Sequence, residues 1–386
     1  MLDTSLKARR LHESFVREMA RLCRAHGAID LAQSFPDFPA PARLKEAACR
    51  AIAADENECS VTWGEPALRE AIAESARGRH GWEIDAGSEI TVTCGSSEAL
   101  VAAVLGILDP GDELVVPEPF QEGCVPAAVL AGAAPRFVPL RSPAWTLDAD
   151  EIAAAFDERT RGIVLAHPHD PTGRVFSRDD LEAVADLCRK WDVVAICDRG
   201  WERLVYEGSG TAPLATFPGM ADRTVTIGGL SQAYGVAGWR VGWAIAPPPL
   251  TAAIRRVHDS LTVAAPTPFQ AAGAEALALG DDFHRELAGT YRRKRDLMVE
   301  GLRAVGFECA PPQGGCHVLA DAAGLGVTDD VGFARRLVRE VGVGCVPGSA
   351  FFSDPDRSRT LVRFAFGKRE ETLIEALRRL EEGLAN

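Results

Sequence analysis

The chain has 386 residues, of which 47% are hydrophobic and 25% charged, a composition typical of folded globular proteins that gives no sign of long disordered stretches. The formal net charge of −13, from 55 acidic against 42 basic residues, argues against nucleic acids and anionic membranes as partners, because both are bound through clustered lysine and arginine. The longest apolar run, Ala99 to Leu108, is well short of the ~20 residues that cross a bilayer.

The N-terminal stretch carries Asp3, Glu13 and Glu18 among its basic residues and lacks an apolar signal core, so we expect it to remain in the mature protein. The ten cysteines are scattered singly, with no CxxC pair, which predicts neither a metal site nor a disulfide frame. Together these features favour a reducing cytoplasm as the location.

From about Glu89 to Ala246, short β-rich runs alternate with helical patterns. The predicted strands are EITVTC (89–94), ELVVP (113–117), RGIVLAH (161–167), VVAIC (193–197), TVTIG (224–228) and RVGWAIAP (240–247). The helices predicted among them include SEALVAAVLGIL (97–108) and RDDLEAVADLCRKW (178–191). This alternation predicts an α/β fold with a mostly parallel sheet wrapped by helices, in which a ligand lies at the carboxyl ends of the strands.

Three consecutive prolines, Pro247 to Pro249, end the alternation, and long amphipathic helices follow, including the stretch 281–306. The chain closes with a smaller α+β unit, which has strands at CHVLAD (316–321) and TLVRFAF (360–366) and a terminal helix at 369–384. A chain of this length divides into more than one core. We predict a large domain over 45–287, a small C-terminal domain over 288–386, and an N-terminal arm with part of the small domain over 1–44.

A candidate anion site lies at TCGSSEAL (93–100), where a strand, a glycine turn and a helix start with two hydroxyls follow one another. By itself this segment is equally typical of an ordinary capped helix. Other segments in a fixed order make the chain similar to the class I/II aminotransferases, in the branch that contains aspartate and kynurenine aminotransferases, from about residue 29 to the end. These segments are LAQSFPDFPAP (31–41), DPGDELVVPEPF (109–120), HPHDPTGRVFS (167–177), CDRGWERLVYEG (197–208), LSQAYGVAGWRVGW (230–243), VPGSAFF (346–352) and VRFAFGK (362–368).

The resemblance implies an enzyme of fold type I that uses pyridoxal 5'-phosphate (PLP). In that fold a large domain carries the mostly parallel sheet and binds the cofactor, and a smaller α+β domain is made of both chain ends. Two copies form a homodimer with active sites at the interface. Neither the dimer nor the cofactor follows from composition.

Several positions keep the residue types that the family uses around PLP. Asp198, directly after the strand 193–197, matches the carboxylate that keeps the pyridine nitrogen protonated, so that the ring withdraws electrons from the substrate's Cα. Ser96 and Ser97 match the loop that cradles the phosphate, and Arg240 matches the arginine that clamps it. Arg363 matches the arginine that binds the substrate's α-carboxylate as a bidentate fork. An anion grip at each end of the cavity is therefore expected.

The family's catalytic lysine has no counterpart. Gln232 stands at its position, with Ser231 beside it as a cofactor-binding candidate. A primary amide can neither form a Schiff base nor take up the substrate's Cα proton, so covalent anchoring and general-base catalysis are both lost. None of the chain's lysines follows a predicted core strand, so none is an obvious replacement: Lys7, Lys45, Lys190, Lys294 and Lys368.

Five further positions around the ring differ from the family's pattern. Gly229 stands in place of a phosphate-binding serine, and Cys59 in place of the tyrosine that reaches the neighbouring subunit's phosphate. Gln121 replaces the aromatic ring that stacks on the pyridine. Asp170 and Trp201 replace the asparagine and the tyrosine that hydrogen-bond the phenolic oxygen of PLP, which an ionised carboxylate would repel. These differences indicate a rebuilt ring site rather than one change at the lysine position.

Three hypotheses stay open. In the first, the chain is a divergent enzyme that binds PLP, or a PLP–substrate adduct, noncovalently, and His167, His317 or Asp170 moves the proton in place of the lysine. In the second, a PLP-independent enzyme reuses the cavity for proton transfer, elimination or cyclisation. In the third, the chain is a catalytically inactive partner of an active homologue. The retained Asp198 favours the first over the third, because an inactive scaffold has no need of that carboxylate.

The substrate is predicted only in outline. Arg363 indicates a carboxylate, and hence an amino acid or a keto acid, and Ser34 is a second substrate-binding candidate. Ser34, Cys316 and His317 depart from the family's usual contacts. We therefore expect an unusual substrate and a place in specialised biosynthesis rather than ordinary transamination.

Overall fold

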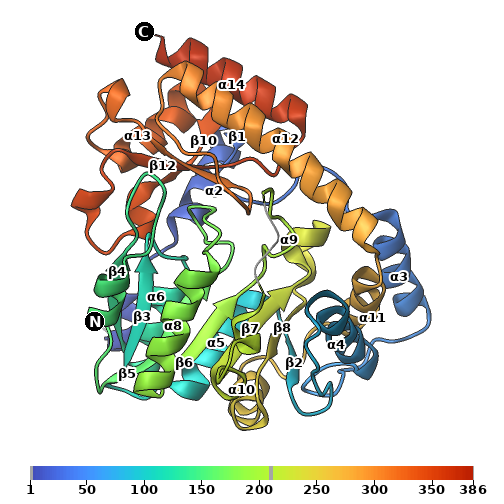
Figure 1. The fold of residues 1–386 in the computed structure, drawn as a ribbon. Helices are drawn as coiled ribbons and strands as arrows, with labels where there is room; N and C mark the ends of the chain where they lie inside the picture. The colour runs from blue at the N-terminus through green and yellow to red at the C-terminus, as the bar shows by residue number, and fades with distance from the viewer. Residues whose placement is uncertain (1–2, 208–211, 386) are drawn as a thin grey trace.

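The structure is a computed structural model that describes residues 3–207 and 212–385. Its largest element is a seven-stranded sheet with the order β2-β8-β7-β6-β5-β3-β4 (Figure 1). β8 runs antiparallel to β2 and β7, and the other neighbouring strands are parallel. The mostly parallel sheet predicted from the sequence is confirmed. Its strands are β2 (Ile90–Thr93), β3 (Glu113–Glu118), β4 (Ala134–Pro139), β5 (Thr160–Ala166), β6 (Val194–Asp198), β7 (Thr224–Gly229) and β8 (Gly242–Ile245).

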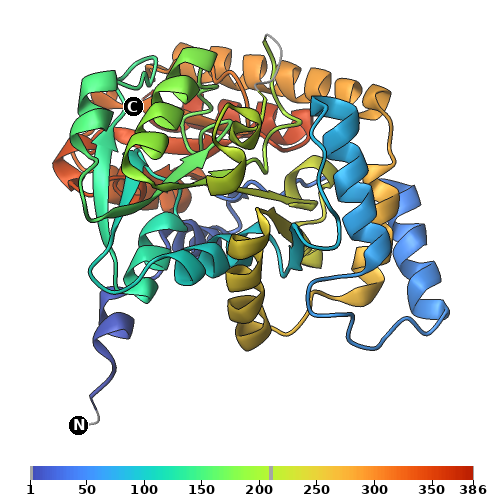
Figure 2. The same ribbon diagram turned by 60° about the horizontal axis from the view of Figure 1, so that its bottom comes forward.

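Helices cover both faces of this sheet, because successive side chains of a strand point to opposite faces and both sets are apolar. Val164 of β5 packs in one buried cluster with residues of α5 and α10, whereas its neighbours Ile163 and Leu165 pack in another with residues of α8. Figure 2 shows these helix layers on the two sides of the sheet. The covering helices include α4 (Pro66–His80), α5 (Ser96–Ile107), α6 (Cys124–Ala131), α7 (Ala149–Ala154), α8 (Arg178–Trp191) and α10 (Pro248–Leu261).

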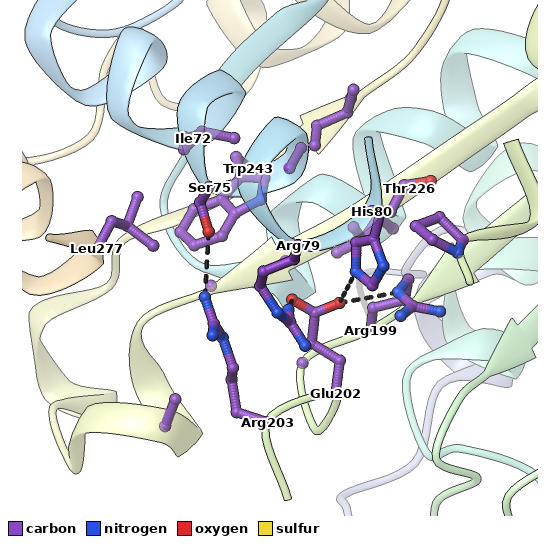
Figure 3. Close-up of a pocket in the computed structure, with 18 of the residues that line it drawn as sticks. Ile72, Ser75, Arg79, His80, Arg199, Glu202, Arg203, Thr226, Trp243 and Leu277 are labelled. Atoms are coloured by element: carbon purple, nitrogen blue, oxygen red, sulfur yellow. Dashed lines mark hydrogen bonds and ion pairs between the residues drawn. The ribbon is translucent and has the colours of Figure 1, made fainter. Parts of the chain in front are cut away.

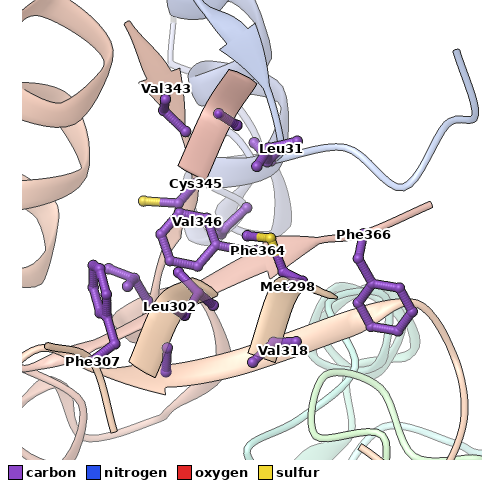
Figure 4. Close-up of a cluster of buried hydrophobic side chains, with 14 of the residues drawn as sticks. Leu31, Met298, Leu302, Phe307, Val318, Val343, Cys345, Val346, Phe364 and Phe366 are labelled. Carbon is purple, nitrogen blue, oxygen red and sulfur yellow. The ribbon is translucent and has the colours of Figure 1, made fainter. Parts of the chain in front are cut away.

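The two ends of the chain form a smaller unit. Its antiparallel sheet has the order β11-β12-β9, and β1 from the N-terminal region pairs with β10. Leu31, Met298 and Phe364, which come from three separate segments, lie in one buried cluster (Figure 4). The strands are β1 (Ile29–Asp30), β9 (His317–Asp321), β10 (Val343–Gly344), β11 (Val346–Pro347) and β12 (Leu361–Ala365).

The long helix α12 (Asp281–Val305) links the two units, because it runs unbroken through residue 288, the predicted boundary. Near its start, Nε2 of His284 lies 3.4 Å from the hydroxyl of Tyr234 in the large unit, whereas Met298 belongs to the core of the small unit. The domain ranges drawn from the sequence therefore stay a prediction. Further helices are α1 (Leu6–Arg10), α2 (Phe15–His26), α3 (Ala42–Ala53), α9 (Ser231–Tyr234), α11 (Thr267–Leu277), α13 (Asp330–Arg336) and α14 (Glu370–Leu384).

Within the described ranges, no helix is long and apolar enough to cross a lipid bilayer.

Candidate functional site

A cavity of about 440 Å³ lies where the carboxyl ends of the large sheet's strands meet the small unit. Turns after strands of the large sheet, the N-terminal region and the small unit's sheet all contribute side chains to its wall. The structure thus brings together residues from almost the whole length of the chain. The predicted site residues that line the cavity are Ser34, Ser96, Ser97, Gln121, Asp170, Asp198, Ser231, Gln232, Arg240, His317 and Arg363.

One end of this cavity suits an anion. α5 begins at Ser96 after Gly95, whose lack of a side chain leaves the first backbone N–H groups uncapped beside the hydroxyls of Ser96 and Ser97. Gly95 has a φ of +82°, and a Cβ there would lie 2.3 Å from Nη2 of Arg240, so glycine is needed for the guanidinium to approach this turn. Nη2 of Arg240 donates to the carbonyl of Cys94 at 3.1 Å. We call this group of residues the anion end.

A buried carboxylate lies deeper in the cavity, at the end of β6. Asp198 accepts hydrogen bonds from the amide nitrogen of Gly200 (2.8 Å) and from Nε2 of Gln121 (2.6 Å). Burial raises the pKa of Asp198, and these two hydrogen bonds oppose that shift. Gln121 was expected where a ring would stack on the pyridine, and its amide instead hydrogen-bonds this carboxylate.

Gln232 lies in α9, close after β7, with its side chain in the cavity wall. Its Oε1 is buried and has no hydrogen-bond partner in the described part of the chain. A Cβ built on Gly200 would lie 3.6 Å from this oxygen and 3.2 Å from Oδ1 of Asp198, so the amide borders the Asp198 turn. No lysine is among the described residues that line the cavity. A buried acceptor without a donor is one that a bound ligand can satisfy.

At the opposite end, three charged or titratable side chains form one network. Oδ1 of Asp170 lies 3.1 Å from Nδ1 of His317 and 3.3 Å from Nη1 of Arg363. Burial by itself would raise the pKa of Asp170, but His317 and Arg363 outweigh it and hold that pKa below the ordinary range. We call these three residues the acid–base end.

His317 in this network is poised as a neutral base. Burial and the nearby Arg363 lower its pKa, against the opposing effect of Asp170, so the imidazole is uncharged at neutral pH. With Nδ1–H donating to Asp170, the other nitrogen, Nε2, is left as the acceptor, and it has no hydrogen-bond partner among the residues described. A carboxylate that orients an imidazole in this way is a recurrent arrangement for general-base catalysis.

Arg363 is already partly engaged. Nη1 faces Asp170, Nη2 donates to the carbonyl of Ala32 at 3.1 Å, and the guanidinium lies 4.7 Å from the centre of the Phe351 ring. Nε is buried without a partner in the described structure. A substrate carboxylate at this arginine would therefore have to compete with, or sit beside, the carboxylate of Asp170.

Two predicted site residues lie outside the cavity wall. His167 follows β5 but faces the other side of the sheet, where its ring stacks on Phe176 with centroids 5.8 Å apart. Burial, with a smaller effect from Arg199, lowers the pKa of His167 to about 3, so this imidazole stays neutral. Trp201 is buried behind His317, with ring centroids 5.6 Å apart at 77°, so it supports the acid–base end and does not line the cavity.

Sequence reasoning missed some of the lining. Arg17 from α2, Gln33 beside Ser34, and Glu122 after Gln121 all border the cavity. Gln33 and Glu122 adjoin predicted site residues and so carried a weak signal. Arg17 carried none, because an N-terminal helix is brought to this wall only by the tertiary fold.

The family model for "Aminotransferase class I and II" matches residues 26–380. Among curated proteins, the chain is 38% identical over 374 residues to a probable N-succinyldiaminopimelate aminotransferase of Mycobacterium tuberculosis, with 94% of each chain covered. It is 35% identical to the methionine aminotransferase of Escherichia coli, with 97% of each covered, and 33% identical to human kynurenine–oxoglutarate transaminase 3, covering 93% of this chain and 86% of the relative.

Solved structures agree with these matches. The N-succinyldiaminopimelate aminotransferase of M. tuberculosis superposes with a TM-score of 0.96 at 37% identity, covering 98% of this chain and 100% of that one. A mutant aspartate aminotransferase of Thermus thermophilus gives a TM-score of 0.90 at 32% identity, covering 99% and 100%.

Proposed function

The chain belongs to the class I and II aminotransferase family, and we propose that it is a divergent member that binds PLP without a covalent bond and uses His317 to move a proton of a carboxylate-bearing amino acid or keto acid. The observation that carries this proposal is the contact between His317 and Asp170 in the same cavity as Gln232. It provides an oriented base where the family's lysine is missing.

Members of this family use PLP, and the residues of this cavity fit two of its polar groups, the phosphate and the ring nitrogen. The anion end suits the phosphate, which Ser96, Ser97, Ser231 and Arg240 would hold. Asp198 suits the ring nitrogen, because each carboxylate oxygen keeps a lone pair beyond its present hydrogen bond. When bound, the cofactor supplies an electron sink for the substrate's Cα.

The covalent bond and the phenolic oxygen are the points of poor fit. Gln232 offers an amide, which leaves the cofactor free to exchange with solvent, although its Nε2 can donate to a ligand oxygen. Asp170, whose pKa His317 and Arg363 hold below its ordinary range, is ionised and repels a phenolate. We therefore propose affinity that comes from the anion end and Asp198 rather than from the phenolic side.

The proton step belongs to His317 in this proposal. Asp170 holds Nδ1–H of His317, so Nε2 is the atom that takes up and returns the proton. Arg363, with Ser34 nearby in the wall, positions the substrate's carboxylate through the N–H groups that Asp170 and Ala32 leave over. Trp201 excludes water from the far side of the imidazole.

The decisive experiment asks whether PLP binds, and how. We expect saturable binding in an absorbance titration, complete loss of the cofactor on dialysis, and no cofactor retained in the mass spectrum after borohydride reduction. The variant Gln232→Lys should retain it after the same reduction, and Gln232→Met serves as the size-matched control. Absence of saturable binding to the wild-type protein would rule the proposal out, as would cofactor fixed covalently to another lysine.

Catalysis is then tested with amino acids that the relatives' names suggest, such as L-methionine and L-kynurenine, together with L-glutamate. PLP-dependent exchange of the α-proton in D₂O, followed by NMR, is expected for at least one of them, with slow net amino transfer. Rapid transamination by the wild-type protein would contradict the proposal that it is not an ordinary transaminase.

A second candidate function, a PLP-independent enzyme, is favoured by one observation. Asp198 is hydrogen-bonded to Gln121 and Asp170 is paired with Arg363, so both of these cavity carboxylates already have partners within the chain. Turnover of a carboxylate substrate that is indifferent to added PLP would select this function. A catalytically inactive partner subunit remains the outcome if neither binding nor turnover is found and an active homologue is recovered with the chain.

We also propose a homodimer, a cytoplasmic location and a role in specialised biosynthesis. Support for the dimer is a set of exposed apolar side chains on the loop 61–63 and at the end of α10, which are joined by a hydrogen bond from Nε2 of His258 to the carbonyl of Thr62 (2.8 Å). The variant Leu261→Asp should convert the dimer to a monomer in light scattering, and a wild-type monomer would refute the dimer. The patch consists of Val61, Trp63, Leu261 and Val263.

A further inference from the structure

A second cavity, of about 750 Å³, lies on the other face of the sheet and takes no part in the proposed function. Asp198 and Arg199 are consecutive at the end of β6, and because successive side chains alternate, Asp198 faces the first cavity and Arg199 the second. We call the second one the rear cavity. Its wall comes from α4, from the segment 199–205 and from the segment 277–281, together with His167 and Pro168.

Three arginines gather on this wall, and Figure 3 shows them with the residues of a smaller adjoining pocket that they also line. Arg79 from α4 and Arg199 both bond Glu202, with Nε of Arg199 at 2.9 Å from Oε2. Arg203 instead donates to Oγ of Ser75 at 3.1 Å. The three arginine side chains are only 23%, 6% and 12% exposed, in chain order, so all three guanidiniums are largely withdrawn from water.

The carboxylates do not balance these charges. Glu202 is the one enclosed carboxylate among the described lining residues, and it is shared by two arginines and, at 3.9 Å, by His80. The carboxylate of Asp281 lies 4.0 Å from Arg203, but its side chain is 86% exposed and therefore well screened. Glu74 is also exposed, at the rim. Arg203 thus has no enclosed counter-charge among the described residues, and Arg79 has only a shared one.

The titration of neighbouring groups agrees with surplus positive charge. Burial and Arg79 lower the pKa of Arg203, and burial together with Arg203 and Arg79 lowers the pKa of His284 to about 4. Arg199, His80 and then Arg79 and Arg203 hold the pKa of Glu202 well below its ordinary value against the effect of burial. A purely structural ion-pair cluster would instead pair each withdrawn arginine with a carboxylate, since an uncompensated buried charge is costly.

We propose that the rear cavity is a binding site for a small, doubly negative ligand, a phosphate monoester or a dicarboxylate, held by Arg79, Arg203 and Ser75. Guanidinium groups with a hydroxyl beside them match the oxygens of either anion. The volume lies within the range of ordinary small-molecule sites. A narrow recess of about 60 Å³, lined by Ile72, Trp243 and other apolar side chains, adjoins the arginines and accommodates a small apolar group on the ligand.

The test uses isothermal titration with two probes, inorganic phosphate and malonate, which separate the two ligand classes. Because phosphate also suits the anion end of the first cavity and malonate also suits Arg363, every titration is made on the wild-type protein and on the double variant Arg240→Gln/Arg363→Gln, which disables both ends. We expect this double variant to retain one saturable site for at least one probe. Adding Arg203→Gln should weaken that site about tenfold or more, as loss of a charge-assisted hydrogen bond does. The charge-matched change Arg335→Gln, on α13, should leave it unaltered.

If Arg203→Gln fails to fold, a second variant that is expected to stabilise the protein still tests the proposal. Ser75→Asp places a carboxylate beside Arg203, so it should abolish anion binding in the Arg240→Gln/Arg363→Gln background and at the same time raise Tm. The proposal is overturned if the double variant Arg240→Gln/Arg363→Gln loses all saturable binding of both probes, or if adding Ser75→Asp to it leaves anion binding intact. Neither result depends on whether PLP binds in the first cavity.

Discussion

Each end of the first cavity has an arginine, but only one of the two arginines is available to bind a ligand. At the anion end, Arg240 donates to backbone carbonyls beside the start of α5, so its charge is left for a ligand. At the acid–base end, Arg363 faces the carboxylate of Asp170. A retained residue type therefore does not guarantee a retained role, because the partner decides what the side chain can still bind.

The largest effect is expected from a variant that disables the acid–base end. His317→Gln should slow PLP-dependent α-proton exchange by roughly 10²- to 10⁴-fold, which is the usual contribution of a general base, while PLP affinity stays unchanged. NMR in D₂O measures the exchange rate. His284→Gln, another buried histidine, is the control and should exchange normally. An unaltered rate in His317→Gln would remove this residue from the mechanism.

The next effect breaks the anion end. Arg240→Gln should weaken PLP binding by about 10- to 100-fold, because a hydrogen bond to a charged group contributes about 1.5–3 kcal/mol. Arg363→Gln should leave PLP affinity unchanged and raise KM for the carboxylate substrate. Equal losses of PLP affinity in both variants would show that PLP binding is not confined to the anion end and substrate binding to Arg363.

A smaller effect is expected from a variant that frees Arg363 from its carboxylate partner. Asp170→Asn removes the carboxylate that competes for Arg363, so a dicarboxylate probe such as maleate should bind up to about tenfold tighter to this variant. Calorimetry in a background that carries both Arg240→Gln and Ser75→Asp, which disable the anion end and the rear cavity, isolates this end. Weaker binding in Asp170→Asn would show that the Asp170 side chain helps to bind substrate rather than compete with it.

The same variant makes a prediction about pH. The pKa of His317 is lowered from 6.5, so its base form persists below that pH, and the acid limb of kcat/KM should lie below 6.5. Asp170 opposes this lowering, so Asp170→Asn should move the limb further toward acid. A shift toward alkaline pH would mean that another group sets the limb.

The smallest effect strengthens the anion end. A Cβ on Gly229 would lie 3.3 Å from the carbonyl of Val241 and 3.9 Å from Cβ of Ser96, so a side chain here is tight but tolerable. Gly229→Ser should improve PLP affinity by up to about fivefold, since one hydrogen bond contributes about 1 kcal/mol. Gly229→Ala, which adds bulk without the hydroxyl, should show no gain.

The sequence predicted the anion end better than the acid–base end, and the reason is distance along the chain. Ser96 and Ser97 follow a strand directly, so local pattern and resemblance both place them. The contacts of Asp170 with His317 and Arg363 join residues far apart in sequence, and no local signal specifies such a pairing.

His167 shows what local patterns leave undecided. It follows a core strand, as a site residue should, but Ala166 is the residue that pairs with Asp198, so the next side chain points to the opposite face. Strand position was predictable, whereas the face of the sheet was not. The rear cavity was missed for the same reason. Arg199 directly follows Asp198 in the sequence, and nothing in the sequence showed that its side chain points to the opposite face of the sheet.

One peptide bond joins Asp198 to Arg199, but the side chain of Asp198 lines the first cavity and that of Arg199 lines the rear cavity. Any displacement of this strand end alters what both chambers offer to a ligand. If an anion in the rear cavity changes the affinity of the first cavity for PLP by some factor, thermodynamic reciprocity requires that PLP change the affinity for the anion by the same factor. Because both side chains move with the end of β6, a ligand that shifts this segment from one cavity also shifts a wall residue of the other.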